Sequence, residues 1–242
     1  MPSLIDRYDL GEKVEVWNEI HELGSLSLLD AASAADVHSV AHRTMGRAAT
    51  NVATLYERLR SLDFAFEDPH VAYVPITTSR VSPTRRLRES VGEIPASLEA
   101  WLELVGNVTF RGHLPALGTL DEWQGQYLDP LEFCCSEDSV SDDLKFHADW
   151  REREEKLFPF TFAGDYLHKN NTSGGAGTCI YLPADEGDAR VIEDDGSPES
   201  RPIWFVDYLR MYFEGGGFRR IAQTKSYPAK LLAHLSHGLL EI

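Results

Sequence analysis

The densest group of chemically useful side chains lies between residues 164 and 175, and it contains Asp165, His168, Lys169 and Asn170. Asp165 could orient His168, which could then act as a general base. Lys169 and the glycine amides that follow it could hold an anion. These four residues are the candidate ligand-binding set, for a small molecule or for hydrolysis. A loop of this composition also forms where polar side chains satisfy their own backbone.

No established catalytic motif accompanies this segment. The sequence lacks a Gly-x-Ser-x-Gly elbow, a Walker A loop, a dinucleotide-binding Gly-x-Gly-x-x-Gly and a His-Glu-x-x-His zinc motif. We therefore assign no catalytic residue and expect no cofactor. An enzyme would have to rest on Asp165 and His168.

Two histidine pairs have a spacing that suits one face of a helix, namely His38 with His42 and His234 with His237. Protein zinc sites need three or four ligands. Neither pair has a neighbouring cysteine or acid that completes such a set. We therefore expect no metal site.

Cysteine usage favours a reducing compartment. The three cysteines are Cys134, Cys135 and Cys179, an odd number with two adjacent, which does not suit a disulfide framework. The first residues show no basic region followed by an apolar run. No segment approaches the ~18 consecutive apolar residues of a membrane helix. These features predict a cytoplasmic protein.

The charge balance indicates the class of partner. The 242 residues include 39 acidic and 23 basic side chains, a net charge of −16, and residues 121–242 alone carry −11. This argues against binding to nucleic acid or to an anionic membrane, because both require clustered Lys and Arg. Such a field would attract a cationic partner, and an acidic surface of this kind also keeps a protein soluble without any partner. The candidate partner-binding residues are six acids and two aromatic side chains: Asp185, Glu186, Asp188, Glu193, Asp194, Asp195, Trp204 and Tyr208.

The elements that must position these residues predict an α+β fold, with an antiparallel or mixed sheet flanked by helices. Residues 34–62 carry a stripe of apolar side chains, at alternating steps of three and four from Met45 onward, which predicts a long helix packed on the body or used as a dimer seam. Strands are expected at 108–110, 131–133, 158–163, 178–183 and 189–192, and further helices at 11–23, 95–105, 202–213 and 228–240. We divide the chain into an N-terminal helical segment (1–70), a linker rich in loop formers (71–93) and an α+β domain (94–242).

The order of features from 94 to 240 resembles the SUKH superfamily, which includes the yeast cell-wall-assembly regulator and many bacterial immunity proteins. Ile94-Pro95 and Ser97-Leu98 open a helix that ends at Gly106-Asn107. Then follow an aromatic strand before Asp165, the Gly174-Gly175 turn, the 178–183 strand, an acidic hairpin and a late helix from Pro202 to Phe213. The segments 37–66 and 165–170 also resemble a bacterial branch with an N-terminal helical extension.

The resemblance implies a non-catalytic α+β module that binds another protein, as an immunity protein neutralises a toxin by covering it. A basic toxin would suit the charge of this chain. Two alternatives stay open: a small-molecule-binding protein or hydrolytic enzyme centred on Asp165 and His168, and a regulatory adaptor that dimerises through the 34–62 helix. The expected oligomeric state is a monomer or a homodimer.

Overall fold

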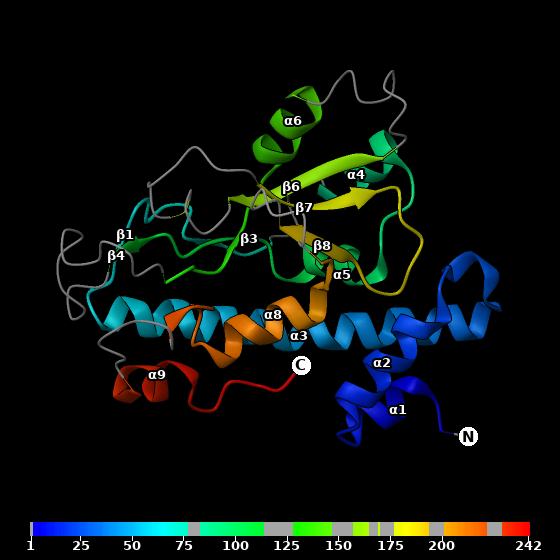
Figure 1. The fold of residues 1–242 in the computed structure, drawn as a ribbon, viewed down its shortest axis with the longest axis horizontal. Helices are drawn as coiled ribbons and strands as arrows, with labels where there is room; N and C mark the ends of the chain where they lie inside the picture. The colour runs from blue at the N-terminus through cyan, green and yellow to red at the C-terminus, as the bar shows by residue number, and fades with distance from the viewer. Residues whose placement is uncertain are drawn as a thin grey trace.

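The computed structural model describes residues 2–76, 83–113, 128–146, 157–164, 169, 177–193, 201–221 and 229–242 (Figure 1). Helices lie beside antiparallel sheets, so the expected α+β class is confirmed. The helices are α1 (Leu4–Asp9), α2 (Lys13–Leu23), α3 (Ala31–Ser61), α4 (Pro83–Val91), α5 (Ala96–Leu104), α6 (Glu137–Phe146), α8 (Phe205–Glu214) and α9 (Ala229–Ser236), with a 3-10 turn at Leu26–Leu28.

The strands form three antiparallel sheets. A four-stranded sheet has the order β6-β7-β8-β9, a three-stranded sheet the order β2-β3-β5, and β1 pairs with β4. The strands are β1 (Ala65–Phe66), β2 (Tyr73–Val74), β3 (Asn107–Thr109), β4 (Gly112–His113), β5 (Glu132–Phe133), β6 (Phe158–Gly164), β7 (Gly177–Leu182), β8 (Arg190–Glu193) and β9 (Ile203–Trp204).

Helix α3 is the longest element and packs on the body as expected. It begins after Asp30, whose carboxylate accepts hydrogen bonds from the amides of Ala32 and Ser33, so the helix starts three residues before the expected residue 34. The apolar stripe is buried from Val37 to Leu59, and α3 contacts α1, α5 and α9 (Figure 1). The buried stripe residues include Val37, Val40, Met45, Ala48, Val52, Leu55 and Leu59. None of the helices in the described ranges combines the length and apolar character needed to cross a bilayer.

Aromatic side chains of β6 build the centre of the core. Phe158, Phe160 and Phe162 alternate along the strand and are buried, as the aromatic alternation predicts. The ring of Phe162 stacks on Phe133 of β5 with centroids 4.4 Å apart, and the ring of Phe205 of α8 packs against Phe133 with centroids 5.4 Å apart. The core therefore joins both larger sheets to α8.

The three sequence ranges are interleaved in the structure. Strand β1 of the first range pairs with β4 of the last, with Ala65 opposite His113. The 71–93 range supplies β2, which pairs with β3, and α4, which contacts α5. Most described residues of the expected linker therefore belong to regular elements of the fold.

Two helices near the sheets differ from expectation. Helix α8 begins at Phe205 rather than Pro202, because residues 203–204 pair with β8 as β9. Helix α6 was not anticipated, since Val140 is its one buried residue and it carries no apolar stripe. Its start is fixed by Ser136, whose hydroxyl accepts a hydrogen bond from the Ser139 amide at 3.1 Å.

Residues 235–242 lie along α3 as a strap, with Leu235 and Ile242 buried in the core and several main-chain groups bound by side chains of α3 and α8. The expected 228–240 helix ends at Ser236. Arg58 donates to the His237 carbonyl, and Asn51 both donates to the Leu240 carbonyl and accepts from the Leu240 amide. Arg210 of α8 donates to the Ile242 carbonyl at 2.8 Å. The strap thus ties α3 to α8.

Candidate functional site

The predicted ligand loop is described only at its start and at Lys169. Asp165, His168 and Asn170 lie outside the described residues. Lys169 is buried, and its Nζ donates to Asp129 Oδ1 at 2.9 Å, to the Tyr212 hydroxyl at 2.9 Å and to the Pro130 carbonyl at 3.1 Å. All three ammonium protons are therefore used inside the protein, and Lys169 does not face an exogenous anion.

Asp129 is the centre of this buried network. Arg219 Nε donates to its Oδ2 at 2.7 Å, and the Tyr212 hydroxyl donates to its Oδ1 at 3.0 Å. Burial alone would raise the pKa of Asp129, but the charges of Lys169 and Arg219 outweigh it and hold that pKa below its usual value. Because each charge has partners, we interpret the network as structural.

The acids assigned to partner binding are mostly engaged within the chain. Asp188 is buried: its Oδ2 lies 2.9 Å from His21 Nε2, and its Oδ1 accepts from the Ala189 amide. Asp185 accepts from the Ser25 hydroxyl at 2.6 Å, and this hydrogen bond lowers its pKa. Glu186 and Glu193 each form an ion pair: Glu186 Oε2 lies 3.6 Å from Arg190 Nε, and Glu193 Oε1 lies 2.7 Å from Arg219 Nη1. Asp194 and Asp195 lie outside the described residues.

The two aromatic anchors are also covered. Tyr208 is fully buried, so its assignment as a surface anchor is wrong for this structure. Trp204 is half-buried between two side chains: the His21 ring stacks on it at 4.2 Å and the Arg190 guanidinium lies 4.2 Å from its centroid. Neither aromatic residue presents a bare face to a partner.

The histidine pairs do not converge on one ion. His38 lies 3.7 Å from Glu99, whereas His42 lies 3.3 Å from a different acid, Glu103. His237 falls beyond the end of α9, so it does not share that helix with His234. Within the described ranges, no group of three or more metal-ligating side chains is found.

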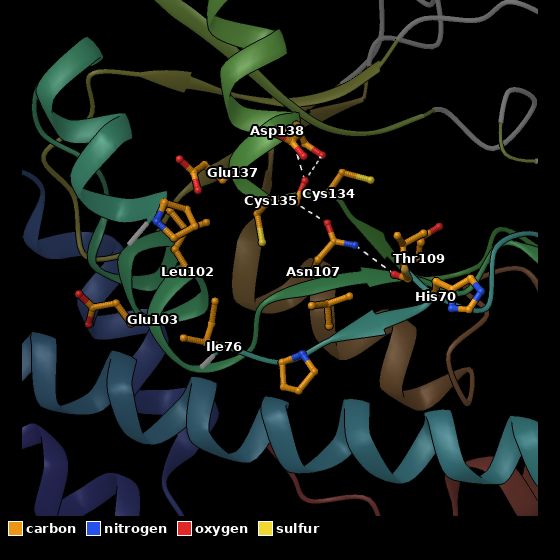
Figure 2. Close-up of a pocket in the computed structure, with 16 residues that line it drawn as sticks. His70, Ile76, Leu102, Glu103, Asn107, Thr109, Cys134, Cys135, Glu137 and Asp138 are labelled. Carbon is orange, nitrogen blue, oxygen red and sulfur yellow. Dashed lines mark hydrogen bonds between the residues drawn. The ribbon is translucent and has the colours of Figure 1, made fainter. Parts of the chain in front are cut away.

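A pocket of about 670 Å³ lies between β2, β3, α5 and the start of α6 (Figure 2). This volume falls within the range of roughly 300–1,000 Å³ that is typical of ligand sites. Its apolar lining consists of Val71, Val74, Pro75, Ile76, Pro83 and Leu102. Polar lining residues include His70, Glu103, Asn107, Thr109, Glu137 and Asp138.

Asn107 fixes two walls of the pocket to each other. Its Oδ1 accepts a hydrogen bond from the Cys135 amide at 3.0 Å, and its Nδ2 donates to the Val71 carbonyl at 3.1 Å (Figure 2). The preceding Gly106 has φ +96°, which lets the chain turn from α5 into β3. The side-chain amide of Asn107 therefore holds the segment before β2 against the segment before α6.

Carboxylates dominate the charge of the pocket. Glu103, Glu137 and Asp138 are exposed at its edge, and no Lys or Arg is found among the described lining residues. Glu137 and Asp138 occupy the first turn of α6, where they offset the positive end of the helix dipole. The pocket therefore suits a cationic occupant better than an anionic one.

The two lining cysteines are protonated thiols at neutral pH. Burial, with a smaller effect of Glu132, raises the pKa of Cys134 to about 12. Burial also raises the pKa of Cys135. Because the thiolate is the nucleophilic form, neither side chain is an activated nucleophile. The pocket is therefore equipped to bind rather than to catalyse through sulfur.

Sequence reasoning missed this site because its residues come from four separated parts of the chain. Asn107 was noted only as the end of a helix, and Glu137 and Asp138 only as part of the acidic half. The Ser136-x-x-Ser139 spacing, typical of a helix start, was the one local signal for this region.

Comparisons of the chain with protein-family models, curated proteins and solved structures gave no match.

Proposed function

We propose that this chain is a non-catalytic module that binds a basic protein, and that it acts as an immunity protein that neutralises a toxin. The observation that carries the proposal is how the charges are distributed. Most basic side chains in the described ranges are held by carboxylates or main-chain carbonyls of the chain itself. Examples are the pairs of Arg7 with Glu19, Arg43 with Asp9, Arg88 with Glu99, Arg111 with Glu67, and Arg219 with Asp129.

The chain carries a large excess of negative charge, because 39 acidic side chains outnumber 23 basic ones and the net charge is −16. Each ion pair within the chain engages one acid and one base, so this excess remains after pairing. Such a field speeds association with a cationic protein and penalises anionic ones. The resemblance to the SUKH superfamily from 94 to 240 supports a toxin as that partner.

Two alternative functions have lost much of their support. The apolar stripe of α3 is buried within the chain, so it does not offer a dimer seam. Lys169 donates a buried hydrogen bond to Asp129, so the candidate ligand loop at 164–175 loses its cationic side chain. A binding or hydrolytic site at Asp165 and His168, which lie outside the described residues, would therefore have to work without the positive charge of Lys169.

The test uses the purified chain and the candidate toxins encoded beside its gene. We expect a stoichiometric complex, loss of toxin activity in proportion to the complex formed, and an association rate that falls as salt rises. The expected salt dependence follows from a screening length of ~30 Å at 0.01 M that shrinks to ~8 Å at 0.15 M.

A toxin that keeps its full activity in the presence of excess chain would contradict the immunity role. An association rate that ignores salt would contradict electrostatic recognition. If the purified chain instead turned over a small substrate, an enzyme would replace the binding module.

A further inference from the structure

We infer that the pocket between α5, β3 and α6 receives an apolar side chain of the protein partner, flanked in the partner's sequence by Lys or Arg. This inference rests on the proposed function and assigns its anchor point. The pocket, rather than the acidic residues of the 185–195 stretch, then contains the main contact. Its two halves, one apolar and one acidic, define the two parts of the occupant.

The apolar half consists of side chains from α5 and from the segment that includes β2. Figure 2 shows Ile76 and Leu102 on the same side of the pocket. Val71 and Ile76 retain 40% and 39% exposure, although both are branched aliphatic residues that are usually buried. An apolar side chain that filled this half would cover them and remove their surface from water.

The acidic half sets the charge of the occupant. Glu103, Glu137 and Asp138 come from α5 and α6. Arg86 Nη1 lies 3.2 Å from Glu137 Oε1, and His42 Nε2 lies 3.3 Å from Glu103 Oε2. Both pairs are solvent-exposed and therefore weak, so a partner's Lys or Arg can compete for these carboxylates.

The exposed rim favours a protein over a free small molecule. Ligand pockets bury most of a small molecule's surface, whereas protein interfaces surround a buried anchor with exposed side chains that exclude water. Val71 and Ile76 are such exposed apolar neighbours, and the three acids form a polar margin beside them. Asn107 keeps the walls in place, so the pocket exists before the partner arrives.

The test measures binding of short peptides to the full chain by NMR, using the amide signals of Asn107, Cys135 and Ser139. The probes are acetyl-Arg-Phe-Arg-amide, acetyl-Glu-Phe-Glu-amide, acetyl-Arg-Ser-Arg-amide and the small cation phenethylammonium. We expect the first peptide to perturb these signals and to bind at least tenfold more tightly than the other three probes.

Two variants locate the site. Glu103→Gln with Glu137→Gln and Asp138→Asn should weaken the first peptide about tenfold, because it removes the acidic margin. The matched control changes three exposed acids elsewhere by the same types of substitution: Glu15→Gln, Glu22→Gln and Asp63→Asn. It alters the net charge equally and should leave the affinity within twofold.

Val71→Lys brings an ammonium group to the rim at an exposed position and should abolish peptide binding. Leu10→Lys, at a residue 78% exposed and outside the pocket lining, is the control that should not. Equal binding of the acidic peptide, or tighter binding of phenethylammonium than of any peptide, would overturn the inference.

Two results distinguish a failure of the anchor pocket from a failure of the immunity role. A toxin that binds Val71→Lys with unchanged affinity would disprove the anchor pocket and leave protein binding intact. Peptide binding in the pocket without any toxin neutralisation would disprove the immunity role and leave the anchor pocket intact.

Discussion

Lys169 and Asp129, forty residues apart in the chain, form an ion pair with Nζ 2.9 Å from Oδ1 and with both side chains almost wholly buried. Each charge depends on the other, because no bulk water solvates it. The pair connects the segment before β5 to the segment between β6 and β7. It therefore gives a residue from the candidate ligand loop a structural role.

Replacing Lys169 should be strongly destabilising. Lys169→Met leaves Asp129 with Arg219 as its one remaining cationic partner, and we expect the free energy of unfolding to fall by about 3–5 kcal/mol. Lys145→Met is the control, because Lys145 forms an exposed pair with Asp142 and its loss should cost less than about 1 kcal/mol. Urea unfolding measures both. Equal effects of the two substitutions would contradict the structural role.

Acid should remove the contribution of Asp129. Its pKa in the folded protein is held low, so its ionised form stabilises the fold fully above the unfolded-state pKa of about 3.9, and this contribution is lost as the pH falls through the lower folded value. The difference in unfolding free energy between the wild type and Asp129→Asn should therefore be constant above about pH 5 and shrink in more acidic solution. Urea titrations from pH 3 to 7 test this. A difference that grew towards low pH would show that folding raises the pKa of Asp129 rather than lowering it.

Glycine substitutions should separate a required glycine from a dispensable one. A Cβ at Gly106 would collide with the Val74 carbonyl oxygen, and the φ of +96° disfavours any side chain there, so Gly106→Ala should destabilise by more than about 1 kcal/mol. At Gly46, inside α3, an added Cβ meets nothing within 4 Å, and Gly46→Ala should stabilise by about 0.5–1 kcal/mol. Thermal unfolding of both variants would show shifts of opposite sign.

Alkylation should report the protonated state of Cys134. With its pKa raised to about 12, the thiolate fraction at pH 8 is roughly three orders of magnitude below that of a free cysteine. Iodoacetamide should therefore modify Cys134 slowly at pH 8 and much faster as the pH rises towards 11. Mass spectrometry of tryptic peptides, with urea-unfolded protein as the reference, gives the rates. Rapid modification of the folded protein at pH 8 would disprove the raised pKa.

Local periodicity accounts for the parts of the fold that the sequence predicted. The regular apolar steps of α3 and the aromatic alternation of β6 each follow from packing one face against the core. Helix α6 has no such stripe because only Val140 is buried, and its start depends on the single Ser136 cap. A pattern search therefore passes over it.

The sites depend on contacts between distant segments, which local patterns do not encode. The burial of Lys169 requires Asp129 and Arg219, and neither lies near it in the sequence. The pocket forms because β2 and β3 pair antiparallel, placing Val74 opposite Asn107. The composition of the acidic stretch predicts carboxylates available to a partner. Asp188 is instead buried, and its carboxylate contacts the His21 ring and accepts a hydrogen bond from the Ala189 amide.

The strap over α3 also bears on how the sequence can change. Asn51, Arg58 and Arg210 bind main-chain groups, which every residue type carries, rather than the side chains of residues 237–242. Substitutions at the exposed strap residues His237, Leu240 and Glu241 can therefore accumulate without breaking those bonds, whereas changes at the three binding residues cannot. Relatives of this chain should accordingly keep Asn51, Arg58 and Arg210 but vary at these exposed positions, so these contacts would not produce pairs of covarying residues.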